Sequence, residues 1–165
     1  MKLGSILRSM DFKKLWSLFL LCIRFARFVI PTIKATRKTI SICDELYQKA
    51  HHRNGPENAF RHALWNALIV QRSVARKLPK SRALAWAKTF TDWHEDFSPN
   101  APLARAMDLH NNRVGRSLAD RFYDEREDFI VAQLLKMVPL SRKRTNSQQF
   151  SEDIGYLVHI EESKP

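Results

Sequence analysis

Prolines and glycines interrupt this sequence at only a few places, and the stretches between them have the length of helices. The main breaks are Pro31, the Asn-Gly-Pro sequence at 54–56, Pro79 and the loop 98–102. Glycine is scarce, with 4 residues in 165, which argues against a turn-rich all-β fold. Apolar residues recur at helical spacing between the breaks, in the stretches 12–30, 33–50, 57–77, 82–96 and 103–137. The sequence therefore predicts an all-α fold, a single helical domain of about five helices.

Three residues carry expectations about where these helices begin, bend or end. Pro31 should end or kink the first helix, because proline has no backbone N–H to donate. Ser81 is a suitable cap for the helix 82–96. The helix 103–137 is expected to bend or divide near Gly115, the weakest helix former within it.

The C-terminal segment has a different character from the helices. Residues 139–153 are polar and predict an irregular chain, and residues 155–160, GYLVHI, have a β-like composition without an evident partner strand. We therefore expect a short irregular or β-like tail. The chain divides into a basic amphipathic N-terminal segment, a helical core that carries the polar motifs, and a polar tail, at 1–53, 54–137 and 138–165.

Positive charge is concentrated in the N-terminal third. The net charge is +11, and residues 1–53 alone carry 11 Lys and Arg against 3 Asp and Glu. Such an excess indicates an acidic partner, either anionic lipid, nucleic acid or an acidic protein. Nucleic acid is not expected, because the sequence shows no helix-turn-helix, zinc finger or aromatic platform.

The segment 12–30 is the most apolar stretch and allows two interpretations. Arg24 and Arg27 interrupt it, so it is neither a clean transmembrane helix nor a good signal peptide. On a helix, its basic residues form a narrow stripe beside a wide apolar face, which could pack into a core or partner, or lie on an anionic membrane surface. We expect a cytoplasmic or inner-membrane-surface location, and the sequence leaves a secreted effector open. The two cysteines, Cys22 and Cys43, are expected to be buried and reduced.

Polar residues line one face of the helix 57–77. Asn58, His62 and Asn66 are spaced i, i+4, i+8, so they share that face, while the surrounding residues are apolar. Burying such groups costs about 1–3 kcal/mol each unless they find partners. They therefore face solvent or form a satisfied network.

Two further helices add polar groups of the kind that bind metals. His94 and Glu95 are adjacent near the end of the helix 82–96, and Asp108 and Asn112 lie one turn apart on the next helix. His62, His94 and Asp108 form a ligand set suited to a divalent ion such as zinc, manganese or iron, with Glu95 as a further ligand or general base. Four residues are candidates for substrate binding, with Arg61 as an anion clamp: Asn58, Arg61, Asn66 and Asn112.

The same residues carry two resemblances. The order His, His-acid and Asp on successive helices resembles helical metal phosphohydrolases of the HD type, although this chain has His-Glu in place of His-Asp and Asp108 follows Glu95 by only 13 residues. The strings NAFRHALWN at 58–66, His94-Glu95, and MDLHNN at 107–112 resemble an uncharacterised bacterial family of helical domains over about residues 54–120. That second resemblance implies a shared site but no known reaction.

Two functions compete at this stage. In the first, the protein is a metal-dependent hydrolase of a phosphoester or other anionic substrate, with His62, His94, Glu95 and Asp108 as the catalytic residues. In the second, it is a non-enzymatic helical protein that binds a membrane surface or a partner, and the polar cluster is a structural network.

Overall fold

The computed structural model describes residues 12–98 and 100–162, and within them the fold is all-α, as predicted. The α-helices are α2 (Phe12–Arg24), α3 (Ala26–Tyr47), α4 (Pro56–Val74), α5 (Lys80–Phe97), α6 (Pro102–Phe122) and α7 (Glu127–Met137). Short 3-10 helices follow α3 at Ala50–His52 and α7 at Val138–Leu140, and a third lies in the tail at Ser147–Glu152. Two strands, β1 (Arg142–Lys143) and β2 (Val158–His159), complete the chain.

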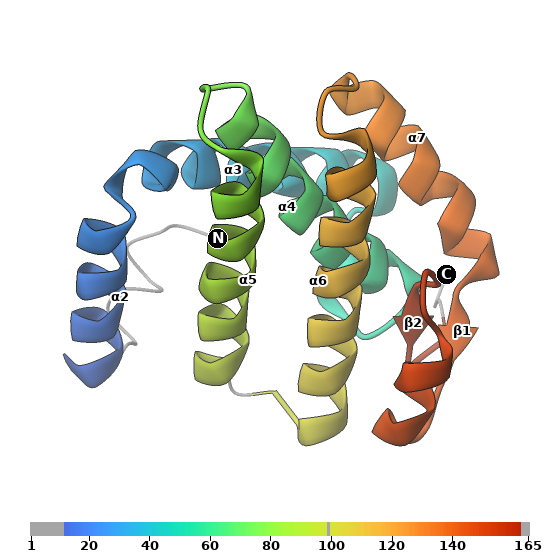
Figure 1. Cartoon of the computed structure of the whole chain (residues 1–165). Coiled ribbons are helices and arrows are strands. Elements are labelled where there is room, and N and C mark those ends of the chain that lie inside the picture. Colours follow the sequence, from blue (N-terminus) through green and yellow to red (C-terminus); the bar gives the residue numbers. More distant parts are fainter. Residues whose placement is uncertain (1–11, 99, 163–165) are drawn as a thin grey trace.

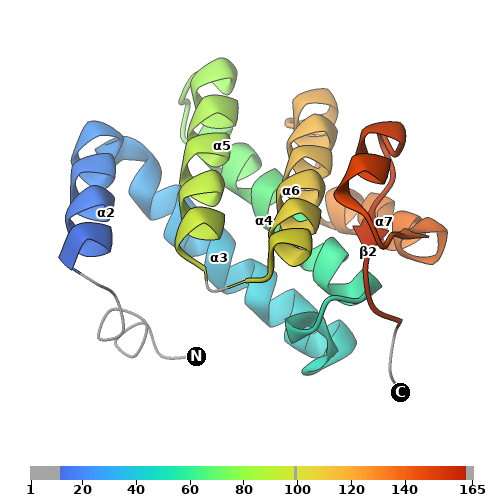
Figure 2. The ribbon, with the colours of Figure 1, turned by 90° about the horizontal axis from the view of Figure 1, so that it is seen from below.

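Helix α4 is the central element of the molecule. It packs against α3 on one side and against α5 and α6 on the other, and α7 also contacts it (Figures 1 and 2). Most of its residues are buried, because a helix with neighbours on several sides has little surface left for solvent. The core around it contains Phe60, Leu64, Leu68, Ile69 and Trp86, all at 0% exposure. The polar side chains on the buried faces of α4 are therefore placed inside the protein.

The first predicted helix is broken, but the break does not lie at Pro31. Helix α2 ends at Arg24 and α3 begins at Ala26, and the chain bends by 114° between them. Pro31 lies inside α3, where it is buried. As the sixth residue of α3, Pro31 removes one hydrogen bond of the helix, the one to the carbonyl of Arg27, and the packing of α3 against α4 outweighs this loss.

Two other expected boundaries are also different. The predicted helix 103–137 divides at 123–126, into α6 and α7, and runs unbroken through Gly115. The acidic pair Glu127 and Asp128 opens α7, where negative charge interacts favourably with the helix dipole. Ser81 does not cap α5, which begins at Lys80 with Pro79 as its cap residue.

The tail finds the strand partner that the sequence did not reveal. β1 and β2 pair in parallel, with Arg142 opposite Val158 and Lys143 opposite His159. The amide side chain of Asn111 on α6 binds the backbone of Val158 twice, donating to its carbonyl at 2.9 Å and accepting from its N–H at 3.0 Å. The tail is thus fixed to the same helix that carries Asp108 and Asn112.

Within the part of the chain that is described, no single helix is both long enough and apolar enough to cross a membrane. Only α2 and α3 together meet that criterion, as a pair sharply bent at Phe25.

Candidate functional site

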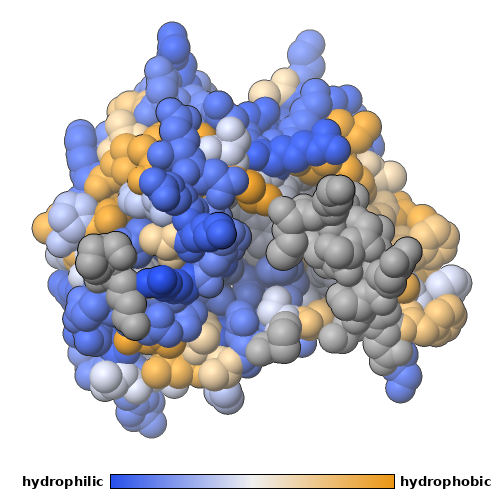
Figure 3. Space-filling model, turned by 180° about the vertical axis from the view of Figure 1, so that it is seen from behind, coloured by the Kyte–Doolittle hydropathy of each residue, from blue (hydrophilic) through white to orange (hydrophobic). Residues whose placement is uncertain are grey.

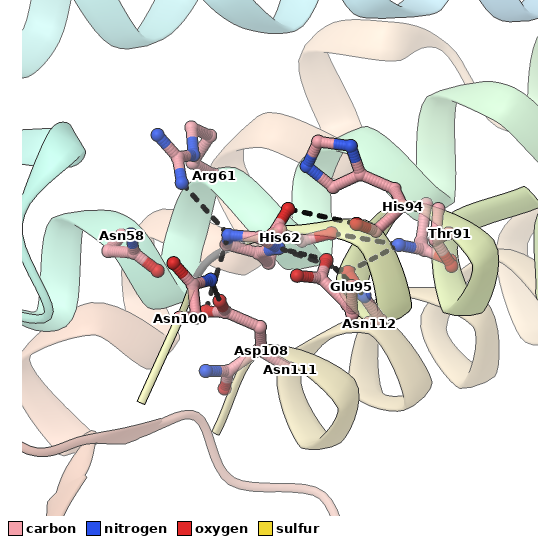
Figure 4. A network of polar contacts seen from close by, with 12 residues as sticks. Asn58, Arg61, His62, Thr91, His94, Glu95, Asn100, Asp108, Asn111 and Asn112 are labelled. Atoms are coloured by element: carbon pink, nitrogen blue, oxygen red, sulfur yellow. Dashed lines mark hydrogen bonds and ion pairs between the residues drawn. The ribbon is translucent and has the colours of Figure 1, made fainter. Parts of the chain in front are cut away.

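The predicted polar stripe on α4 faces the interior. Asn58, His62 and Asn66 are all buried, at 3%, 3% and 0% exposure. Their face of α4 is turned toward α5 and α6, whose own polar residues Glu95, Asp108 and Asn112 are equally buried. The three helices thus bring their polar groups together at one place, as Figure 4 shows.

His62 is the centre of this cluster. Its Nδ1 lies 3.3 Å from Asn112 Oδ1 and 3.4 Å from Glu95 Oε1, both of them acceptors. Asn112 Oδ1 is identified as the amide oxygen because it accepts from Asn66 Nδ2 at 2.7 Å. We therefore assign the ring proton to Nδ1, which leaves a lone pair on Nε2 of the neutral ring.

The Nε2 atom of His62, which carries the lone pair, lies beside the charged groups of Arg61 and Asp108. Arg61 Nη2 donates to Nε2 at 2.9 Å, and Asp108 Oδ1 lies 3.3 Å from the same nitrogen. Nε2 could thus serve as a ligand atom with a carboxylate oxygen beside it, and the guanidinium of Arg61 is the cation now in contact with it.

Amide and hydroxyl groups hold the cluster in position. Asn112 Nδ2 donates to Glu95 Oε1 at 3.2 Å, and Asn66 Oδ1 accepts from both Thr91 Oγ1 at 3.2 Å and Arg116 Nη1 at 2.9 Å. Partners of this kind orient the residues that would contact a ligand, as outer-shell groups do around metal ligands. The amides of Asn66 and Asn112 thus make their hydrogen bonds within the protein, and their role in substrate binding stays a prediction.

The cluster has more hydrogen-bond acceptors than donors. Three buried oxygens, Glu95 Oε2, Asp108 Oδ1 and Asn58 Oδ1, have no hydrogen-bond donor among the described residues. Buried polar atoms are nearly always paired, since an unpaired one costs about 1–3 kcal/mol. Three unpaired acceptors in one cluster indicate a binding site suited to a cation or to a ligand with several hydrogen-bond donors.

The two carboxyl groups have opposite pKa shifts. Burial, reinforced by the nearby charge of Glu95, raises the pKa of Asp108 to about 6. Burial also acts to raise the pKa of Glu95, but the contacts with His62 and Asn112 outweigh it, so that pKa is lowered. One carboxyl group is thus held ionised and the other is poised near neutral pH, an arrangement common in acid–base catalysis.

The metal-ligating geometry involves Glu95 rather than His94. One ligand atom each from His62, Glu95 and Asp108 lies within 4.8 Å of the others, which suits a metal ion. His94 was also predicted as a ligand, but it is not in this group. Its ring is exposed and makes an edge contact with Trp65 at 5.2 Å between centroids. His94 therefore lies at the rim of the cluster.

The cluster includes residues that the sequence did not single out. Asn100 Nδ2 donates to Asp108 Oδ2 at 3.1 Å, and Thr91 and Arg116 support Asn66. Helical spacing could have revealed two of them, because Thr91 is one turn before Glu95 and Arg116 one turn after Asn112. Asn100 lies in a loop, where spacing gives no such signal.

A second group of possible metal ligands lies at the start of α4. Asp44, His51 and His52 meet there, and His51 Nε2 contacts Asp44 Oδ1 at 2.9 Å. Arg61 links this group to the main cluster, since its Nη1 lies 3.3 Å from His52 Nδ1. Asp44 and His52 are exposed, so this group lacks the burial of the first.

The comparisons with known proteins identify a family whose function is unknown. The model of the family DUF6973, described as a domain of unknown function, matches residues 19–142. The match begins well before residue 54, where the resemblance seen in the sequence begins, so it includes α3 and part of α2. Neither the curated proteins nor the solved structures contain a match.

Proposed function

Because the chain belongs to the DUF6973 family, a domain family of unknown function, we propose its function from the site alone: a metal-dependent hydrolase of phosphoesters or related anionic substrates. The observation that carries this proposal is the buried group of His62, Glu95 and Asp108, with its unpaired acceptor oxygens. A divalent cation would supply the positive charge that these atoms lack.

His62 Nε2, Asp108 and Glu95 would hold the ion. The 3.3 Å between His62 Nε2 and Asp108 Oδ1 is close to the spacing of about 3.4 Å between neighbouring ligands of a tetrahedral ion with bonds near 2.1 Å. Zinc, manganese and iron all accept this mixture of imidazole and carboxylate. The proton assigned to Nδ1, facing Asn112 and Glu95, is the outer contact that fixes a ligating histidine in its tautomer.

Arg61 has the role of an anion clamp in this proposal. It is half-buried, and its Nη2 occupies the lone pair of His62 that the ion would use. An ion at this position would displace the guanidinium, which would then be free to bind an anionic oxygen of the substrate. A guanidinium suits phosphate because its N–H groups match two oxygens at once.

The proposed reaction is a hydrolysis, for which a bound ion would supply a water of lowered pKa. Water forms a bond to phosphorus, the bond to the ester oxygen breaks, and the proton of the water ends on the leaving alcohol. The carboxyl groups of Glu95 and Asp108, with their divergent pKa values, are the groups that can move this proton. His94, exposed at the rim, remains a candidate to contact the substrate.

Metal analysis of the purified protein tests the proposal. We expect the wild-type protein to retain a transition metal, His62→Ala to lose it, and His94→Gln to keep it, because only His62 belongs to the buried group. His110→Gln is the matched control, since His110 is a buried histidine that contacts Tyr156 and Arg113 instead. Hydrolysis of bis(p-nitrophenyl) phosphate should follow metal content in the His62 variant.

Two results would contradict the proposal. If no variant, including the wild type, binds zinc, manganese or iron in a titration of the metal-free protein, then Arg61 is the permanent cation and the cluster is a structural network. If His94→Gln loses metal as completely as His62→Ala, the ligand set is the one the sequence predicted, and the assignment to Glu95 is wrong.

A further inference from the structure

The outer face of α2 is apolar and has no partner within the described chain. Five large side chains are exposed along it, with Phe12 at 74%, Ile23 at 60% and Trp16 at 53%: Phe12, Trp16, Phe19, Leu20 and Ile23. Their spacing of i, i+4, i+7, i+8 and i+11 places them on one side of the helix, which we call the α2 face. The rings of Phe12, Trp16 and Phe19 stack in sequence along it.

The opposite side of α2 is fixed to the rest of the protein. Leu21 of α2 and Phe25, the residue that follows α2, pack against the core, where Phe25 lies 5.0 Å from Trp86 between ring centroids. Trp93 on α5 donates its indole N–H to Ser17 Oγ at 2.8 Å. The helix is therefore held with its α2 face outward. Figure 3 shows apolar side chains at the right-hand edge of the molecule, the side on which α2 lies.

A hollow lined by arginines continues this face at the junction of α2 and α3. The hollow has a volume of about 210 Å³, and its lining includes three arginines together with Ile23, which also belongs to the α2 face. The arginines are Arg24, Arg27 and Arg82, which we call the arginine group. None of them forms a salt bridge within residues 12–98 and 100–162.

The charge of this region is one-sided. Between residues 12 and 43 the sequence has seven Lys and Arg and no Asp or Glu. An apolar helical face with aromatic residues, beside arginines that form no salt bridge with the described residues, is complementary to the surface of an anionic bilayer. A protein partner with an apolar patch would not need this uniform positive charge.

We propose that the α2 face and the arginine group dock this protein on an anionic lipid bilayer. The stacked rings enter the boundary between headgroups and acyl chains, with α2 parallel to the membrane surface. The arginine group binds lipid phosphates through the hollow at the α2–α3 junction. Phosphate suits these side chains because a guanidinium binds its oxygens in pairs.

Sedimentation with vesicles of equal parts phosphatidylglycerol and phosphatidylcholine tests this proposal on the full chain, with vesicles of phosphatidylcholine alone beside them. We expect the wild-type protein to sediment with the anionic vesicles, and the affinity to fall as salt is added. A variant with Phe12→Ser, Trp16→Ser, Phe19→Ser and Ile23→Ser should bind at least about tenfold more weakly, because it loses the apolar contact. Its matched control is Leu140→Ser with Ile154→Ser, two exposed apolar residues of the tail.

A second variant separates charge from apolar contact. Arg24→Gln, Arg27→Gln and Arg82→Gln together should weaken binding to anionic vesicles by about tenfold or more and remove the preference over phosphatidylcholine. The control changes the net charge equally at three exposed arginines elsewhere: Arg53→Gln, Arg76→Gln and Arg121→Gln.

Three outcomes would overturn the proposal. The first is wild-type protein that stays in the supernatant with both vesicles. The second is equal binding by the two arginine variants, which would mean that vesicle binding depends on the net charge of the protein and not on the position of these arginines. The third is a wild-type dimer in light scattering that becomes a monomer in the α2-face variant without any vesicle binding, which would assign the face to a second copy of the chain.

Discussion

At the scale of single residues, Asp108 shows how the site departs from what stability alone would favour. Its carboxyl group is 2% exposed, and Oδ1 has no hydrogen-bond donor. A folded domain gains nothing by burying an ionisable group in this way, and sites that bind ligands commonly carry such a cost. The cost should be measurable in the metal-free protein.

Asp108→Asn should stabilise the metal-free protein near neutral pH. The pKa of Asp108 rises from 3.8 to about 6 on folding, so folding favours the protonated carboxyl over the ionised one. That contribution is complete below pH 3.8 and is lost as pH rises through about 6, which costs the wild type up to about 3 kcal/mol above that pH. The uncharged amide avoids this cost at every pH.

Urea unfolding in the presence of a chelator measures the difference. The variant should be the more stable at about pH 7 and equal to the wild type below pH 3.8. Asp124→Asn, at an exposed aspartate, is the control and should change little. A variant less stable than the wild type in chelator would contradict this expectation, because it would mean that groups of the protein itself stabilise the charge of ionised Asp108 without metal.

The side chains of the site could be predicted only in part. Helical spacing correctly aligned Asn58, His62 and Asn66, because one face of a helix is a local property of sequence. It led to His94 as a ligand and Glu95 as a further ligand or general base, although these adjacent residues differ by about 100° in direction on the helix. The choice between them depends on how α5 is rotated against α4, which is set by core residues such as Trp86.

At the scale of elements, α4 and α6 approach each other closely beside the site. Gly115 on α6 lies against the backbone of Ala63, the residue after His62. A Cβ at Gly115 would lie 2.0 Å from the carbonyl oxygen of Ala63 and 2.7 Å from its Cα. The glycine is thus needed for the close approach of the two helices.

Gly115→Ala should therefore destabilise the protein by about 3 kcal/mol or more, because a helix backbone cannot yield as a side chain can. Thermal unfolding by circular dichroism measures the loss, and Ser117→Ala, at an exposed position of the same helix, is the control. Alanine is the better helix former, so the control should be neutral or slightly stabilising. If Gly115→Ala unfolds within about 0.5 kcal/mol of the wild type, the two helices are not in contact as described.

The ends of the elements were harder to predict than the elements themselves. The helical pattern correctly gave α4 and α5, but local rules placed one break at Pro31 and another near Gly115. In the structure both residues lie inside helices. A residue of low helix propensity breaks a helix only where no tertiary contact outweighs that propensity. Buried contacts such as those of Gly115 with α4 stabilise the helix by more than the low propensity costs.

At the scale of the whole molecule, the C-terminal tail closes the structure over its central helices. The backbone N–H groups of Ile160 and Glu161 both donate to the carbonyl of Asn54, just before α4, at 3.1 Å. Asn111 holds Val158 against α6. The tail therefore joins the beginning of α4 to the middle of α6, the two helices that carry His62 and Asp108. Its long-range contacts explain why composition alone did not reveal the partner of β2.

A buried ion pair holds this tail together, and its loss should loosen the whole molecule. The side chain of Asp153 is fully buried and accepts from Arg144 Nη2 at 2.8 Å and from Arg142 Nη1 at 2.7 Å. Arg144 above all, then Arg142, lowers the pKa of Asp153 against the opposing effect of burial. A lowered pKa means that this pair stabilises the fold above pH 3.8 and is lost as pH falls below that value.

Asp153→Asn should accordingly lower the free energy of unfolding by about 2 kcal/mol at neutral pH, since two arginines lose their charged acceptor. The difference from the wild type should shrink as pH falls below 3.8, where the wild-type carboxyl is also neutral. Urea unfolding across this range measures it, with Glu152→Gln, an exposed neighbour, as the control. Because the tail fixes α6 beside Asp108, the variant should also bind metal more weakly than the control. A variant with unchanged stability but weaker metal binding would instead indicate a local effect on α6.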